Sequence, residues 1–212
     1  PHRMPVTLSV QIRAWINRQR RALWRLLFGR VLFGEVSQGQ TRPFTRIAPT
    51  TVIEHEARLA LADHVYIGPF NWIEASGGVR LDEGVQVTSH VCIVTHSSHR
   101  ALRLLGARYA QWAGPGTPPG WVDGPVHVGA YSFIGPHALL EAGTVLGRGT
   151  LVRAGAQVRG QFPDFAVLEG RPARVVGDTR QADAALLQRY PECEAWRRDW
   201  AGPVEAPAEP RP

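Results

Sequence analysis

The sequence predicts an all-β solenoid, a parallel β-helix of short strands and tight turns, with helical segments at both ends. Aliphatic residues recur every six positions through the centre of the chain, whereas helical spacing of apolar residues is confined to its ends. The 22 glycines and 17 prolines among 212 residues supply many turns. Hydrophobic residues make up 44% of the chain, so wholesale disorder is excluded.

Residues 1–40 form the first expected segment, and a basic amphipathic helix is predicted over residues 8–33. Residues 1–34 contain seven arginines and no acidic residue, whereas the remaining 178 residues contain 17 arginines and 18 acidic residues. Arginines interrupt every apolar run, so no stretch reaches the ~20 apolar residues of a membrane span. Two interpretations remain: the helix packs on the body or on a neighbouring subunit, or residues 8–33 lie on an anionic membrane surface.

Residues 41–177 form the predicted β-helix. Two series of Leu, Ile or Val at six-residue steps carry this prediction: Leu61, Ile67, Ile73, Val79, Val85, Val91, and Val128, Ile134, Leu140, Leu146, Val152, Val158. A period of six fits neither a helix nor a lone amphipathic strand, but it fits a strand plus a tight turn. Three such units close a triangular coil of 18 residues, and coils stack at the strand spacing of ~4.8 Å.

The regular repeat is interrupted by an insertion over residues 97–125, and an insertion of this size in a compact solenoid is usually functional. A C-terminal helix is expected over residues 178–200, broken at Pro191. Residues 201–212 are rich in proline and are expected to be a disordered tail.

Composition limits the chemistry and the partners. The chain has no lysine, which excludes a lysine nucleophile or Schiff base. The positive charge belongs to one terminal segment rather than to the body, so nucleic-acid binding is not expected. Cys92 and Cys193 are 101 positions apart and form neither a disulfide framework nor a metal clamp. Two isolated cysteines fit a reducing compartment, so a cytoplasmic protein is expected. The membrane interpretation of residues 8–33 would place it at the inner face of the cell membrane.

Specific motifs flank the insertion. The first block ends in VCIVTHSSHR, which contains Thr95–His96, and the second block is followed by LEGRPARVVG, which contains Gly170–Arg174. This layout resembles the hexapeptide-repeat acetyltransferases, and most closely the bacterial O-acetyltransferases of surface polysaccharides. The resemblance implies a left-handed β-helix, acetyl-CoA as acetyl donor, and a homotrimer with active sites between subunits.

The resemblance also implies roles for individual residues. His96 matches the general base that takes the proton of the acceptor hydroxyl, and His99 is a second candidate. Asp82, Glu83, Glu74 and Glu141 are candidates to orient His96, and their spacing does not choose among them. The expected contacts to acetyl-CoA come from Pro136, Ala154, Arg159, Gly160, Arg171 and Arg174. The family commonly has Thr-Lys where this chain has Arg159–Gly160, and Asn in place of Arg171.

Three residues of the insertion are candidates for acceptor binding: Arg100, Trp112 and Trp121. The two tryptophans suit stacking on a sugar ring or adenine, or they fasten the insertion to the body. We therefore predict an acetyl-CoA-dependent O-acetyltransferase acting on a sugar hydroxyl of a polysaccharide or its precursor.

Three other functions are alternatives to this prediction. A sugar amine N-acetyltransferase would use the same donor. A zinc carbonic anhydrase would gather His90, His96 and His99 around one ion, although no metal is expected in the acetyltransferase. The third alternative is a non-catalytic scaffold associated with the membrane.

Overall fold

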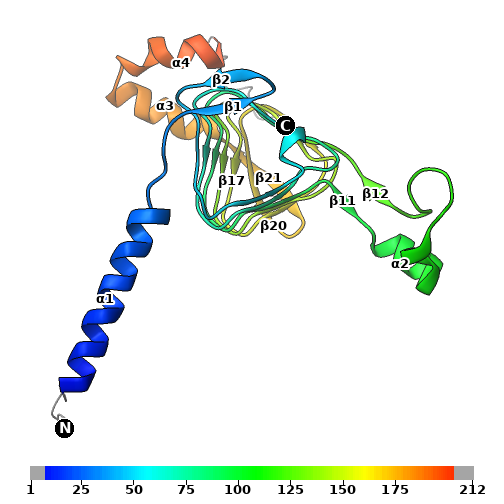
Figure 1. The fold of residues 1–212 in the computed structure, drawn as a ribbon. Coiled ribbons are helices and arrows are strands. Elements are labelled where there is room, and N and C mark those ends of the chain that lie inside the picture. The colour runs from blue at the N-terminus through cyan, green and yellow to red at the C-terminus, as the bar shows by residue number, and fades with distance from the viewer. Residues whose placement is uncertain (1–7, 203–212) are drawn as a thin grey trace, which may run out of the picture.

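The computed structural model describes residues 8–202, so most of the tail expected at 201–212 lies outside the described residues. The body is a coil of three parallel sheets, and the chain adds one strand to each sheet in turn as it winds (Figure 1). The first sheet has six parallel strands: β3 (Arg46–Ile47), β6 (Tyr66–Ile67), β9 (Gln86–Val87), β14 (Phe133–Ile134), β17 (Leu151–Val152) and β20 (Ala166–Gly170).

The other two sheets have five strands each. The second sheet consists of β4 (Val52–Glu54), β7 (Trp72–Glu74), β10 (Cys92–Val94), β15 (Leu139–Leu140) and β18 (Gln157–Val158). The third consists of β5 (Leu59–Leu61), β8 (Val79–Leu81), β13 (Val126–Val128), β16 (Val145–Leu146) and β19 (Gln161–Phe162). All twelve aliphatic residues of the two six-residue series are buried in one core.

The length of one coil changes along the chain. Paired residues are 20 positions apart in the first block, as in Ile53 with Ile73, and 18 apart in the second, as in Leu140 with Val158. The expected 18-residue coil is therefore wrong for the first block. Its two extra residues lie between the second and third sheets, where the equivalent strand positions Ile73 and Leu81 are eight residues apart instead of six.

The six-residue pattern survives this change because alternate residues of a strand face the same side. Val79 and Leu81 are both buried on β8. A count in steps of six from Ile73 therefore reaches Val79, which is aliphatic and buried, although the residue of β8 equivalent to Ile73 is Leu81, two positions later. The corner between the second and third sheets is therefore wider in the first block than a regular coil would make it. The insertion leaves the coil at this same corner, which we call the wide corner.

The ends of the coil are closed by antiparallel pairs. β1 (Glu35–Ser37) and β2 (Gln40–Arg42) form a hairpin, and Ser37 exchanges hydrogen bonds with Leu59 and Leu61 of β5. Residues 35–40, which we assigned to the N-terminal segment, therefore contact the coil. At the other end β21 (Ala173–Asp178) folds back antiparallel onto β20.

The C-terminal segment forms two helices, with the break at Pro191 that the sequence predicted. They are α3 (Thr179–Arg189) and α4 (Cys193–Ala201), with Pro191 between them. Asp178 caps α3 by accepting a hydrogen bond from the Arg180 amide. These helices lie on a different side of the coil from the insertion (Figure 1).

α1 (Leu8–Phe28) projects away from the coil (Figure 1), and all of its residues are exposed. Packing of α1 on the body of its own chain, the first half of the packing interpretation above, is therefore absent. Across residues 8–202, no helix combines the length and the apolar character needed to cross a membrane.

Candidate active site

The insertion is a folded arm. It leaves the coil through β11 (His96–Ser97) and returns through β12 (Val122–Asp123), which pair antiparallel with His96 opposite Asp123. Between them lie α2 (His99–Leu105) and the 3₁₀ helix η2 (Gly106–Gln111). The arm extends outward from the wide corner (Figure 1), so His96 lies where the arm joins the coil.

His96 is held by a residue of the preceding coil. The ring atom Nδ1 of His96 lies 2.8 Å from Oε2 of Glu74 and 3.1 Å from the hydroxyl of Ser76. The pairing of β7 with β10 places Glu74 beside Val94, so the 20-residue coil aligns Ser76 with His96. The two extra residues at the wide corner therefore set the position of the histidine's partners.

Glu74 is buried and ionised. Burial opposes ionisation of its carboxylate, but hydrogen bonds from Ser76 and Thr95 outweigh that effect and lower its pKa to about 2. The Thr95 hydroxyl donates at 2.7 Å and the Ser76 amide donates at 2.7 Å. A carboxylate can only accept from Nδ1, so Nδ1 carries the ring proton and Nε2 is the nitrogen that can accept one.

Three carboxylates that we considered for orienting His96 have other partners. Asp82 contacts Arg80 and His127, and Glu83 contacts the ring of His64. Glu141 accepts a hydrogen bond from Gln157, although it lines the same cavity as His96.

A cavity of about 380 Å³ opens beside His96 at the wide corner. Three polar side chains that were candidates for the site line it with His96: His99, Arg159 and Glu141. The rest of the lining consists of Val94, Ser97, Val122, Leu139 and Ala142. The side chain of His96 is 32% exposed, which leaves it accessible to a ligand. The Nδ1 of His99 lies 2.7 Å from the Ser97 hydroxyl, so His99 shares the cavity but contacts a different partner from His96.

Trp121 covers one face of His96. The two rings are stacked, with centroids 4.7 Å apart and planes inclined by 8°. Trp112 instead bonds within the arm, since its indole N–H donates to the carbonyl of Gly116 at 3.2 Å. Arg100 is exposed on α2. The two tryptophans, considered together in the sequence, therefore have different surroundings.

The expected acetyl-CoA contacts divide between two corners. Arg159 and Gly160 follow β18 at the same corner as His96. Pro136, Ala154 and Arg171 follow β14, β17 and β20 at the corner between the first and second sheets, where Arg171 donates to the carbonyl of Gly155 and Gly155 donates to that of Pro136. Arg174 lies on β21 opposite Glu169. One corner of the coil does not hold all six residues.

The histidines considered for zinc do not assemble within this chain. The His90 ring stacks on His137 and lies against Phe70, at the corner between the first and second sheets rather than at the wide corner. Among the described residues, no three His, Cys, Asp or Glu side chains gather closely enough to hold a metal ion.

Solved structures share this architecture. A hexapeptide-repeat-containing acetyltransferase from Vibrio cholerae, solved with acetyl-CoA, matches with a TM-score of 0.53 at 19% identity over 84% of this chain and 92% of its own. A maltose O-acetyltransferase from Clostridium difficile matches with a TM-score of 0.52 at 16% identity, over 76% and 75%. This chain has the hexapeptide-repeat acetyltransferase fold. The comparisons thus confirm, at the level of the fold, the resemblance to hexapeptide-repeat acetyltransferases that the sequence motifs indicated.

The chain has two further similarities to known proteins. An N-acyltransferase from Bacillus cereus, solved with dTDP and 3-hydroxybutyryl-CoA, matches with a TM-score of 0.51 at 15% identity over 71% of this chain and 88% of its own. A probable acetyltransferase of Mycobacterium tuberculosis is 28% identical over 140 residues, 66% of this chain. The chain spans 44% of the length of that curated relative. No family model matches the sequence.

Sequence reasoning proposed His96 as the base but did not single out the residues that contact its ring. Glu74 is 22 positions away from His96, and Ser76 is 20 away. A signal was present: the eight-residue step from Ile73 to Leu81, once recognised, gives a 20-residue coil and aligns Ser76 with His96. The regular six-residue spacing of Val79, Val85 and Val91 concealed it.

Proposed function

We propose that this protein is an acetyl-CoA-dependent O-acetyltransferase that acts on a sugar hydroxyl of a polysaccharide or its precursor, with His96 as general base. The observation that carries the proposal is the pairing of His96 with ionised Glu74 beside an open cavity. A histidine whose Nδ1 is fixed by a carboxylate presents Nε2 as a base of defined orientation.

The residues of the wide corner fit the proposed chemistry. Acetyl-CoA supplies an acetyl thioester, whose carbonyl carbon is the target of the acceptor hydroxyl. Nε2 of His96 takes the proton of that hydroxyl and returns it to the departing thiol, while Glu74 stabilises the imidazolium that exists between the two transfers. Arg159, in the same cavity, is a suitable partner for a phosphate of the donor.

An amine acceptor is the second candidate, because one structural neighbour is named an N-acyltransferase and another an O-acetyltransferase. Thiol release from acetyl-CoA, measured with matched pairs of acceptors, distinguishes O-transfer from N-transfer. The pairs are galactose with galactosamine and glucose with glucosamine. O-transfer predicts release with both neutral sugars and a product that hydroxylamine cleaves. Release only with the amino sugars, giving a product that resists hydroxylamine, would instead establish N-transfer.

We also propose a homotrimer with a left-handed coil, as the resemblance implies. The division of the expected donor contacts between two corners supports this assembly. A second copy placed beside the first would bring its Pro136, Ala154 and Arg171 to the His96 corner of its neighbour, completing one site from two chains.

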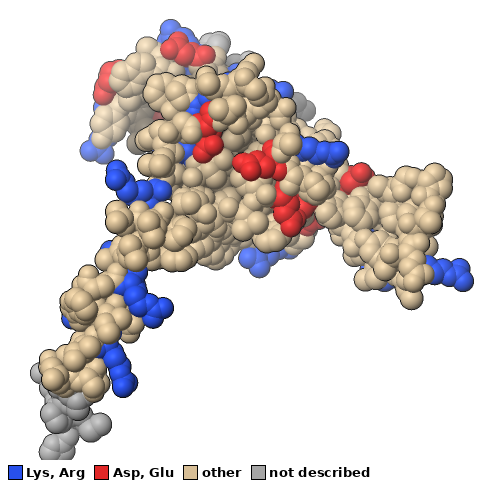
Figure 2. Space-filling model, in the orientation of Figure 1, with Lys and Arg blue, Asp and Glu red and all other residues tan. Residues whose placement is uncertain are grey.

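We propose that α1 contacts an anionic membrane surface, at the inner face of the cell membrane in the cytoplasm. Its exposure supports this, as do its arginines, which Figure 2 shows along the helix without acidic side chains among them. Leu8, Ile12, Trp15, Leu23 and Leu26 follow helical spacing on one side, and each is at least half exposed. Both cysteines are free, in keeping with a reducing compartment.

A further inference from the structure

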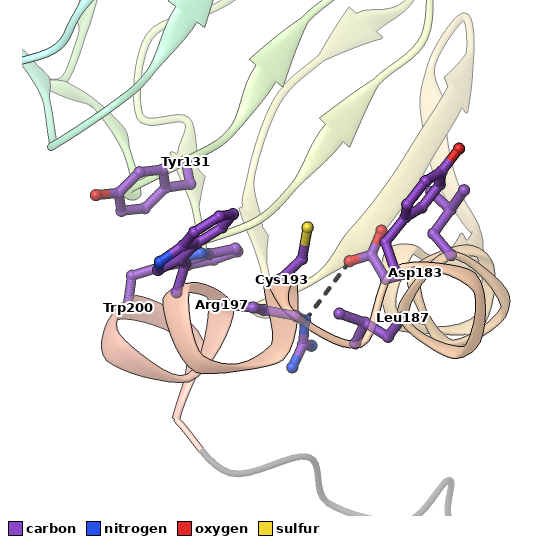
Figure 3. Close-up of a pocket in the computed structure, with 9 residues that line it drawn as sticks. Tyr131, Asp183, Leu187, Cys193, Arg197 and Trp200 are labelled. Atoms are coloured by element: carbon purple, nitrogen blue, oxygen red, sulfur yellow. Dashed lines mark ion pairs between the residues drawn. The ribbon is translucent and has the colours of Figure 1, made fainter.

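A second cavity of the described residues lies away from the proposed active site. It has a volume of about 630 Å³ and is formed by α3, α4 and the corner between the third and first sheets. Figure 3 shows Tyr131 and Trp200 on one side of it and Asp183 and Leu187 on the other. The lining is completed by Leu186, Tyr190, Cys193, Trp196 and Arg197. It includes none of the residues proposed above to bind the acetyl donor, to bind the acceptor or to act as the base.

The lining of this cavity is aromatic and aliphatic. Tyr131 lies against Trp200, with ring centroids 4.6 Å apart, and these rings form one wall. Trp196 is 67% exposed and Leu186 is 55% exposed, so a large apolar surface remains open to solvent on α3 and α4. Aromatic walls of this kind bind flat or apolar groups through burial and stacking.

A charged side chain is buried among these apolar groups. Arg197 is only 9% exposed, and its Nε has no hydrogen-bond partner. Asp183 lies 3.9 Å from this nitrogen, which is too long for a hydrogen bond (dashed line in Figure 3). Burial raises the pKa of Asp183 although Arg197 lies beside it, so their ion pair stabilises the carboxylate only weakly.

Further guanidinium groups adjoin Arg197. Arg148, Arg180 and Arg197 all lie over the ring of Phe165, with distances from their Cζ atoms to the ring centroid of 5.6, 4.9 and 5.8 Å. Asp164 pairs with Arg148 and Asp178 pairs with Arg180. Among the described residues, the one ion pair of Arg197 is the long contact with Asp183, although the charge of Arg197 also lowers the pKa of Asp178. A buried guanidinium with unused donor capacity favours an anion.

We propose that α3, α4 and the Tyr131 corner form a second ligand site, which binds an aromatic or aliphatic group that carries a phosphate or carboxylate. The apolar part lies against Tyr131, Trp196 and Trp200, and the anionic group bonds to Arg197. Asp183 competes with the anion for the same guanidinium.

The probes that test this site are 1-naphthyl phosphate and the neutral 1-naphthol, titrated into the full chain by calorimetry. We expect the phosphate to bind at least ~10-fold more tightly than the naphthol, about the effect of one charge-assisted hydrogen bond. Arg197→Gln should abolish this preference, and Trp200→Leu should weaken both probes. The control Arg80→Gln, on β8, should change nothing.

Asp183→Asn separates a binding role from a structural one, because it leaves Arg197 in place. Removing the competing carboxylate should tighten 1-naphthyl phosphate several-fold, whereas a purely structural Arg197–Asp183 contact predicts a less stable protein with unchanged or weaker binding. Equal affinity for the two probes, or no binding, would overturn the proposal. Stoichiometric displacement of 1-naphthyl phosphate by acetyl-CoA would also overturn it, because the probe would then occupy the donor site.

Discussion

Glu74 is the residue on which the proposed chemistry of His96 depends. Its carboxylate is 5% exposed and accepts hydrogen bonds from Thr95 and from the Ser76 amide as well as contacting the imidazole. These bonds fix both the charge of Glu74 and the position of the ring. Removing Glu74 should therefore affect catalysis and folding stability together.

Glu74→Gln tests both effects. We expect kcat to fall ~10- to 100-fold, because an amide stabilises the imidazolium less than a carboxylate does. The pKa of Glu74 in the folded state is about 2, below its ordinary value of 4.5. Ionised Glu74 therefore stabilises the fold by about 3 kcal/mol above pH ~4.5. This contribution is lost as the pH falls toward 2. Urea unfolding at pH 7, 4 and 3 should show a smaller acid-induced loss for the variant than for the wild type. An equal loss would contradict this assignment.

Trp121 supports His96 through ring stacking rather than through a hydrogen bond. Trp121→Phe keeps an aromatic face and should retain most of the activity. Trp121→Ala frees one side of the imidazole and should lower kcat about fivefold, in keeping with the ~1 kcal/mol of an aromatic pair. Steady-state kinetics with Trp112→Ala as control checks this, since Trp112 bonds only within the arm. A Trp121→Ala effect confined to the KM of the acceptor would instead assign Trp121 to acceptor binding.

At the scale of elements, the core strands were predictable and the coil length was not. Aliphatic residues at six-residue steps identify inward positions, and all of those positions are buried. The eight-residue step from Ile73 to Leu81 is hidden in the sequence because Val79, two residues before Leu81 on the same strand, also faces the core. His96 stood out by its motif and its place beside the insertion, but Glu74 becomes its neighbour only through a pairing across coils.

α1 is the element whose role is most separable from the coil, because it projects away from the coil and all of its residues are exposed. A chain that starts at Glu35 should keep its β-helix and its activity on a soluble acceptor. The full chain should bind vesicles containing anionic lipid at low salt and dissociate as salt rises, since each basic side chain near the surface contributes ~1 kcal/mol and salt screens the attraction.

Vesicle flotation of both chains, at low and high salt, measures this difference. Equal flotation with and without residues 1–34 would contradict the membrane role. Loss of the oligomer or aggregation of the shortened chain would show instead that α1 packs on a neighbouring subunit.

At the scale of the whole molecule, the expected donor contacts occupy two corners, and we infer that one chain alone does not complete the proposed site. We therefore expect the active protein to be a trimer, three times the 23.4 kDa of one chain. Light scattering coupled to size exclusion, with activity measured on the same fractions, checks this. Full activity in fractions of monomer mass would contradict it.

The account as a whole depends on His96 acting as the base of acetyl transfer. Thiol release from acetyl-CoA, measured with an accepted sugar for the wild type, His96→Ala and His99→Ala, tests this most directly. We predict that His96→Ala lowers kcat at least ~100-fold while the Kd for acetyl-CoA stays within a factor of two or so, and that His99→Ala retains most of its activity. An active His96→Ala beside an inactive His99→Ala would contradict the assignment, as would activity that follows bound zinc and disappears with a chelator.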